Sequence, residues 1–176
     1  MSKLSHADNP IQFYTATILE WKHLLKPDKY KQIIVDSLTY LVNEQRVKIF
    51  GFVIMSNHIH LIWQGTQTHS LKHTQLSFMK YTAQQIKFDL EKHHPNVLPY
   101  FVVDAKDRKY QFWERNALSI DIMSSEVFIQ KLNYIHKNPL RANLCENETD
   151  YYYSSVKHYL EMQHDFHFLE PYEKQL

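Results

Sequence analysis

The stretch that decides the fold is residues 51–63, which read Gly-Phe-Val-Ile-Met-Ser-Asn-His-Ile-His-Leu-Ile-Trp. Apolar residues run on both sides of the Ser-Asn pair, and this pattern predicts a hairpin of two short buried strands, 47–54 and 58–64. Side chains of a strand alternate between its two faces, so His58 and His60 are expected to point to the same side. Two neutral imidazoles side by side begin a divalent metal site, and further ligands must come from elsewhere in the chain.

Length and composition are those of a single folded domain. The chain has 176 residues, of which 44% are hydrophobic, enough for one domain over 1–176 with its core at about 11–140 and a helical extension at 141–176. The formal net charge of +1 neither indicates nor excludes a nucleic-acid partner, so any basic surface must be local. The chain has two glycines, and this scarcity argues against a phosphate-binding loop of the P-loop or dinucleotide type.

The cellular setting can also be inferred from the sequence. A single cysteine, Cys145, leaves no internal disulfide and suits a reducing cytoplasm. The first six residues contain no apolar segment like that of a signal peptide, and no later run is long and apolar enough to span a bilayer. We therefore expect a cytoplasmic protein without a membrane partner.

The remaining secondary structure follows from apolar periodicity. It predicts, in order, a strand over 11–19, a helix over 27–43, the hairpin, a helix over 70–92, a short strand over 98–103, a strand over 111–123, and helices over 125–138 and 156–162. This order is that of a ferredoxin-like split β-α-β-β-α-β unit. The fold class is therefore α+β, an antiparallel sheet with helices on one face plus C-terminal helices. From residue 163 onward we expect a loosely packed tail.

The helix predicted over 125–138 carries two neighbouring stripes of side chains. The apolar stripe, which should face the sheet, consists of Phe128, Leu132 and Ile135. The second stripe, rotated by about 100°, consists of Lys131, Tyr134 and Asn138. It offers a cation that could lie near a phosphate, a hydroxyl that could attack phosphorus, and a carbonyl oxygen suited to a hard cation such as Mg²⁺ or Mn²⁺.

Taken together, these motifs resemble a known family. The chain places His58-Ile59-His60 first, then Phe112-Trp113, and then residues 134–142, Tyr-Ile-His-Lys-Asn-Pro-Leu-Arg-Ala. This order resembles the HUH single-tyrosine transposases, and most closely their relatives associated with repetitive extragenic palindromes (REP). The resemblance extends from about residue 11 to residue 160. Ser56 stands where the family usually has proline, a difference that should alter the loop and leave the histidines in place.

The resemblance implies an activity and a set of site residues. His58, His60 and Asn138 would hold one divalent metal, Mg²⁺ or Mn²⁺, and Tyr134 would attack single-stranded DNA beside a hairpin. The products would be a 5′-phosphotyrosine and a free 3′-hydroxyl. Proteins of this family act as monomers or as homodimers. From their positions, Lys131, Lys137 and Arg141 are further candidates for contacts with the DNA backbone.

Other interpretations stay open at the level of sequence. A domesticated, non-catalytic protein that only binds hairpin DNA would keep the same fold, and a metal hydrolase for small phosphoesters would use the histidines but leave Tyr134 without a role. Tyr81, with Gln85 one helical turn later, repeats the spacing of a tyrosine and an amide. Asn138, which precedes a proline, could simply end its helix.

Overall fold

The computed structural model describes residues 9–66 and 69–172. Its strands are β1 (Gln12–Thr17), β2 (Val47–Ile54), β3 (His58–Gly65), β4 (Val102–Ala105), β5 (Arg108–Tyr110) and β6 (Leu118–Asp121). Its α-helices are α1 (Asp28–Asn43), α2 (Leu71–His93), α3 (Ser125–Arg141) and α4 (Val156–Tyr159), and its 3₁₀ helices are η2 (Leu19–Trp21), η3 (Pro95–Phe101) and η4 (Glu148–Asp150). The predicted α+β class and the order of the main elements are confirmed.

The central sheet has four antiparallel strands in the order β2-β3-β1-β6, and β4 pairs with β5 as a separate hairpin. Because β1 and β2 both pair antiparallel with β3, the connection between them through α1 joins parallel strands. The connection from β3 to β6 through α2 does the same, because both strands pair antiparallel with β1. This is the predicted split β-α-β-β-α-β topology.

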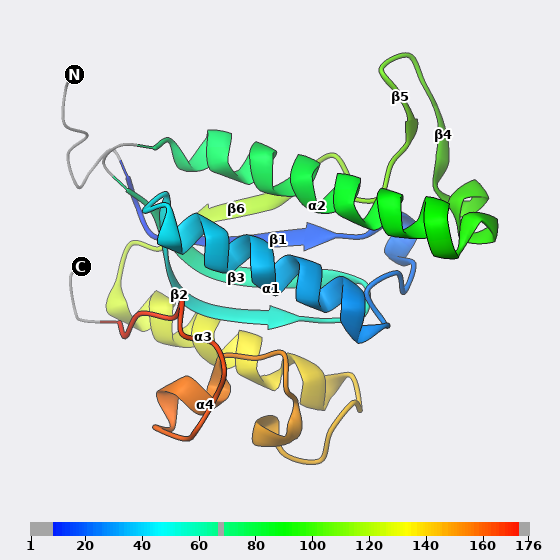
Figure 1. The fold of residues 1–176 in the computed structure, drawn as a ribbon. Coiled ribbons are helices and arrows are strands. Elements are labelled where there is room, and N and C mark those ends of the chain that lie inside the picture. Colours follow the sequence, from blue (N-terminus) through cyan, green and yellow to red (C-terminus); the bar gives the residue numbers. More distant parts are fainter. Residues whose placement is uncertain (1–8, 67–68, 173–176) are drawn as a thin grey trace.

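Helices cover both faces of the sheet. Figure 1 shows α1 and α2 together in front of it, while α3 lies on the other side. Alternation along the strands explains this: Tyr14, Phe52 and Leu61 pack in the cluster beneath α1 and α2, whereas the adjacent Val53 and Ile62 pack against α3. The nearly continuous burial of β2 and β3 follows, because both of their faces are covered.

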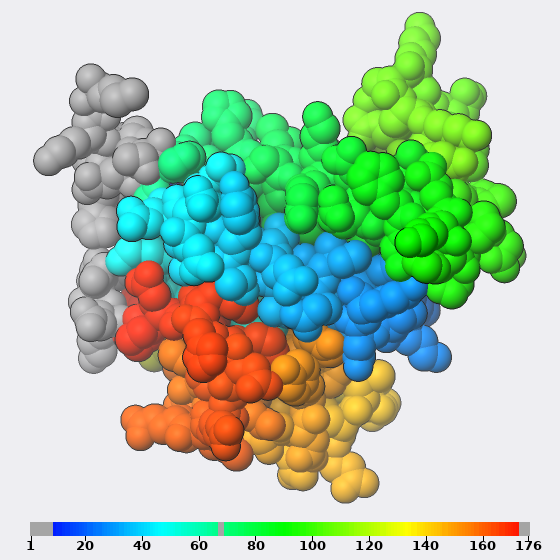
Figure 2. Space-filling model, in the orientation of Figure 1, coloured from blue at the N-terminus to red at the C-terminus, as the bar shows by residue number. Residues whose placement is uncertain are grey.

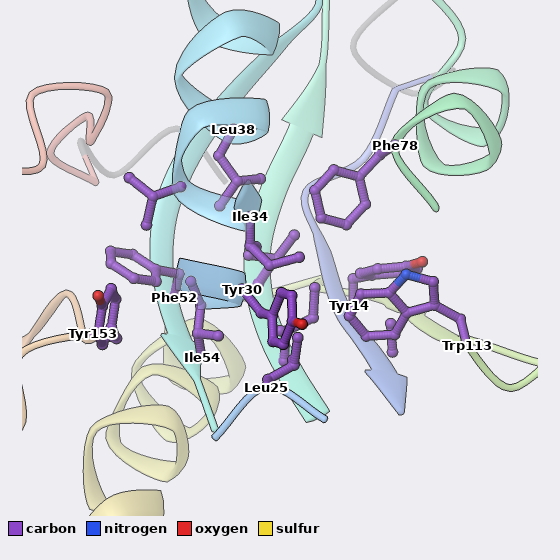
Figure 3. Close-up of a cluster of buried hydrophobic side chains, with 14 of the residues drawn as sticks. Tyr14, Leu25, Tyr30, Ile34, Leu38, Phe52, Ile54, Phe78, Trp113 and Tyr153 are labelled. Atoms are coloured by element: carbon purple, nitrogen blue, oxygen red, sulfur yellow. The ribbon is translucent and has the colours of Figure 1, made fainter. Parts of the chain in front are cut away.

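The larger core cluster lies between the sheet and the helices α1 and α2. Figure 3 shows Ile34 and Leu38 of α1 over Phe52 of β2, with Tyr14 and Trp113 at the far end of the cluster. The Trp113 indole N–H donates a hydrogen bond of 3.1 Å to the Thr82 hydroxyl of α2, so this large side chain is buried without losing its polar partner.

Two predicted strands differ from the structure. Residues 98–101 belong to the 3₁₀ helix η3, because Pro95 and Pro99 favour a tight turn, and the strand begins only at Val102. In the predicted strand 111–123, only β6 is regular. Trp113 forms an isolated bridge with Ile18, and the chain between that bridge and β6 is irregular.

Helix α3 continues three residues beyond its predicted end at Asn138. Pro139 lies inside the last turn, where it removes a single backbone N–H from the helix. The helix ends in a Schellman arrangement: Asn143 adopts a left-handed φ of 54°, and the Leu144 amide donates to the Pro139 carbonyl at 3.0 Å. Asn138 therefore does not end the helix, and its side chain is available for another role.

The expectation of a loosely packed tail from residue 163 was wrong as far as Tyr172. Phe166, Phe168 and Leu169 are buried, because the Phe166 ring packs edge-on against Phe52 and Leu169 forms a parallel bridge with Ile49. Figure 2 shows this C-terminal segment in red, beside α1 in blue and cyan. The prediction failed because residues 163–172 form no helix or strand, and so show no apolar periodicity from which burial could be inferred. Their aromatic residues were the remaining sign of burial.

Within the described residues, no helix is both long and apolar enough to cross a membrane. The N-terminal residues 1–8, on which the expectation about a signal peptide rested, lie outside the part of the chain that the structure describes.

Candidate functional site

The two histidines leave β3 on the face that α3 covers. Their ring centroids are 4.8 Å apart, with the rings close to perpendicular. His58 is partly exposed at the start of the strand, whereas His60 is only 4% exposed and stacks on Phe13 of β1 at 5.3 Å. The predicted alternation is therefore correct: both imidazoles lie on one face, while Ile59 is buried in the opposite cluster.

One of the two ring nitrogens of His60 has a hydrogen-bond partner. Its Nδ1 is hydrogen-bonded to the Thr15 hydroxyl at 2.8 Å, while its buried Nε2 has no hydrogen-bond partner among the described residues. Burial, which has the largest effect, and the positive charges of His58 and Lys131 together lower the pKa of His60 to about 3. The ring is therefore neutral at physiological pH, with a lone pair on Nε2 when the proton is on Nδ1.

His58 has a similar arrangement. The Asn57 side-chain oxygen can only accept, so the His58 Nδ1–H donates to it at 2.7 Å, and Nε2 carries the lone pair. Burial lowers the pKa of His58, and a hydrogen bond with the Asn138 side chain opposes this effect. The amide of α3 thus reaches the first histidine of β3.

Tyr134 lies beside the second histidine. Its ring centroid is 5.3 Å from that of His60 and 6.0 Å from that of Phe13, and the residue is 40% exposed. The Arg141 guanidinium lies 5.4 Å from the Tyr134 ring centroid and comes from the same side of α3, two helical turns after Tyr134. Tyr134 thus contacts His60 while part of its side chain remains open to solvent.

The other basic residues named from the sequence are placed differently. Lys131 lies over the Phe13 ring, with its Nζ 4.8 Å from the centroid, and so adds positive charge at the edge of the site. Lys137 is exposed on α3, and no contact places it beside the histidines. The structure thus brings Lys131, Tyr134 and Asn138 to the histidines as one stripe.

The donor set fits a divalent metal held by two imidazoles and one amide oxygen. Among residues 9–66 and 69–172, no group of three His, Cys, Asp or Glu side chains could hold a metal. Any third ligand that these residues supply would have to be of another type, and the Asn138 amide is in contact with His58. Nε2 of His60 is buried and has no hydrogen-bond partner in the described part of the chain, and a metal would supply that partner.

Comparison of the structure with solved structures identifies its fold. A structure described as a REP-associated tyrosine transposase bound to a REP hairpin superimposes with a TM-score of 0.63 and 14% identity, covering 86% of this chain and 79% of the other. The protein has the fold of a REP-associated tyrosine transposase. No family model and no curated protein sequence matches the chain.

A second structure resembles this transposase fold more weakly. It is a protein of Deinococcus radiodurans R1 classed as a transposase, with a TM-score of 0.47 and 12% identity, over 73% of this chain and 90% of the other. At such identities the likeness concerns the fold, and the chemistry must be argued from the side chains.

Four further residues surround the histidines and were missed from sequence: Phe13, Thr15, Trp21 and Asn57. Thr15 lies opposite His60 in the pairing of β1 with β3. This register depends on how the strands assemble, and apolar periodicity does not reveal it. Asn57 directly precedes His58 and could have been recognised as a partner of its ring.

The alternative tyrosine lies elsewhere. Tyr81 is exposed on α2, across the sheet from the histidines. A cleft of about 780 Å³ also opens on that side, between α2 and the segment 107–117, with Tyr14 and Trp113 among its lining residues. His58, His60 and Tyr134 are not among the residues that line this cleft, so the candidate site is separate from it.

Proposed function

We propose that this protein nicks single-stranded DNA beside a hairpin and holds the new 5′ end covalently on Tyr134. The observation that supports this most is a continuous row of rings from two distant segments. His58 and His60 come from β3, and their ring centroids are 4.8 Å apart. Tyr134 comes from α3, and its ring centroid is 5.3 Å from that of His60. A phosphate placed over the histidines would be within reach of the phenol.

The chemistry exchanges one phosphoester for another. The Tyr134 oxygen attacks the scissile phosphorus, and its new bond forms as the bond between phosphorus and O3′ breaks. The phenol loses its proton, and the departing 3′ oxygen takes one up. Because a phosphodiester is stored in the covalent intermediate, the step is reversible and needs no ATP.

Residues of this chain would bind and orient the reacting groups. The Nε2 atoms of His58 and His60 and the Asn138 amide oxygen would hold one Mg²⁺ or Mn²⁺, whose charge would offset that developing on the phosphate. The Thr15 hydroxyl, hydrogen-bonded to Nδ1 of His60, would hold the ring in the orientation that points Nε2 at the metal. Arg141, whose guanidinium lies over the Tyr134 ring, would help to orient it.

Hairpin DNA is the substrate class we infer. The structure that shares this fold with a TM-score of 0.63 is described as bound to a REP hairpin. Lys131, Lys137 and Arg141 are the candidates for contacts with the DNA backbone. A protein that only bound such DNA would have no need for Tyr134, and the experiment below separates the two possibilities.

The test is covalent capture. The full chain is incubated with Mn²⁺ and a hairpin oligonucleotide that carries an unpaired tail, and the products are separated on a denaturing gel. We expect a protein–DNA adduct with the wild type and none with Tyr134→Phe, which should still bind the hairpin in a mobility-shift assay.

Tyr81→Phe is the matched control, because it removes a hydroxyl from an exposed tyrosine on the other side of the sheet. It should form adduct at the wild-type level. An adduct with Tyr134→Phe would refute the assignment of the nucleophile. Hairpin binding by the wild type without any adduct would favour the non-catalytic alternative.

A further inference from the structure

Trp21 differs from the two other tryptophans of the chain in its surroundings. Trp63 and Trp113 are buried in the core, whereas Trp21 is 60% exposed. Its ring nevertheless lies beside the site, with its centroid 5.8 Å from that of His58 and the two planes steeply inclined. A large aromatic surface is thus presented to solvent next to the proposed metal ligands.

The backbone that presents this indole is in an unfavourable conformation. Glu20 and Trp21 both have left-handed φ values, 54° and 57°, which bulky residues rarely adopt and which glycine adopts easily. Stability of the fold alone would favour glycine at position 21. A bulky residue held in this conformation beside a candidate site indicates a role in function.

Hydrogen bonds from two other segments hold the strained turn in place. The Glu20 amide donates to the Glu114 carboxylate at 2.7 Å, and the Leu19 amide donates to the Phe112 carbonyl at 2.8 Å. The Asn57 side chain, which also orients His58, donates to the Trp21 carbonyl at 3.3 Å. The indole and the His58 imidazole are therefore positioned by the same amide side chain.

The rings form one row in the order Trp21, His58, His60, Tyr134. Trp21 and Tyr134 thus stand at opposite ends of the histidine pair. We propose that Trp21 is a stacking site for one unpaired nucleobase of the DNA strand, next to the phosphate that lies over the histidines. This inference rests on the proposed function, because it assumes that the phosphate of a DNA strand occupies the site.

The local charge is compatible with a nucleotide. The Glu20 carboxylate would repel a phosphate, but it is paired with Lys22. Any nucleobase presents a π face, so stacking on an indole provides affinity without requiring a particular sequence.

Tryptophan fluorescence can report on this site selectively, because the other two indoles are buried. The probe is a hairpin oligonucleotide with an unpaired tail, added to the Tyr134→Phe protein so that cleavage does not interfere. We expect the tail to quench the emission and to protect it from acrylamide. A hairpin without the tail, or one with an abasic tail, should produce neither effect.

Variants connect the signal to position 21. Trp21→Ala should weaken binding of the tailed hairpin by about tenfold, while binding of the hairpin without a tail stays unchanged. Trp21→Phe should recover part of the affinity, and Tyr100→Ala, which removes an exposed ring outside the site, should match the parent. Trp21→Gly should lose the affinity while its melting temperature stays level or rises, since glycine relieves the left-handed backbone.

The outcomes separate this inference from the proposed function. If the wild type forms a covalent adduct but Trp21→Ala binds the tailed hairpin as tightly as its parent, the stacking site is refuted and the nuclease assignment stands. Equal quenching by the abasic and intact tails would also refute it. If the wild type neither binds tailed hairpins nor forms an adduct, both proposals fail.

Discussion

At the scale of single residues, the site depends on a hydroxyl that does not touch the reacting atoms. The Thr15 hydroxyl is hydrogen-bonded to Nδ1 of His60 at 2.8 Å, and this hydrogen bond fixes the orientation of the ring. The opposite nitrogen, Nε2, is buried and has no partner within residues 9–66 and 69–172, so it is available to a metal.

Replacing this hydroxyl should weaken metal binding. We expect Thr15→Val to reduce the affinity for Mn²⁺ by about 10- to 100-fold, because the ring loses its orienting partner while the side-chain volume is nearly kept. Isothermal titration of Mn²⁺ into the protein measures this without DNA. Thr15→Ser, which keeps the hydroxyl, should bind nearly as the wild type does, and unchanged affinity in Thr15→Val would contradict the positioning role.

At the scale of elements, α3 carries the proposed nucleophile, Tyr134, and burial sets the position of this helix. Phe128, Leu132 and Ile135 lie in the core cluster on this face of the sheet, which fixes the angle at which the stripe with Tyr134 meets β3. A hydroxyl cap at Ser124, which accepts from the Val127 amide at 3.3 Å, begins the helix.

A cavity beneath this helix should destabilise the fold. We expect Ile135→Ala to lower the free energy of unfolding by about 2–4 kcal/mol, because Ile135 is completely buried. Ile129→Ala on the exposed side of α3 should change it by no more than about 0.5 kcal/mol. Urea denaturation followed by circular dichroism compares the two, and similar losses in both variants would contradict the described packing of α3.

At the scale of the whole molecule, the C-terminal segment completes the fold. It adds the rings of Phe166 and Phe168 to Phe52 in the core, and the Tyr172 ring stacks on Phe128 of α3 at 3.7 Å. The segment thus connects the larger core cluster to the helix that carries Tyr134.

This role predicts a large effect from a residue far along the chain. Phe166→Ala should lower the free energy of unfolding by about 3 kcal/mol, because its ring is buried against Phe52. Phe88→Ala, at an exposed position of α2, should change it by about 0.5 kcal/mol or less. Chemical denaturation measures both variants, and a loss below about 1 kcal/mol for Phe166→Ala would mean that the segment packs loosely.

The sequence predicts what depends on local periodicity. The hairpin around His58, the ends of α1 and the two stripes of α3 could all be inferred, because spacing along the chain determines which side chains share a face. The pairing of Thr15 with His60 could not, since it depends on the register between strands distant in sequence. The left-handed backbone at Trp21 could not be predicted either, because nothing in its local sequence requires a positive φ.

The most direct test of the central claim is to locate the covalent bond. The adduct formed with Mn²⁺ and a tailed hairpin is digested with nuclease and trypsin and analysed by mass spectrometry. Tryptic cleavage after Lys131 and Lys137 yields the peptide Leu-Asn-Tyr-Ile-His-Lys, in which Tyr134 is the only tyrosine. We predict that a nucleotide phosphate is found on this peptide, and a nucleotide on the peptide that begins at Tyr81, or on any other tyrosine, would contradict the account.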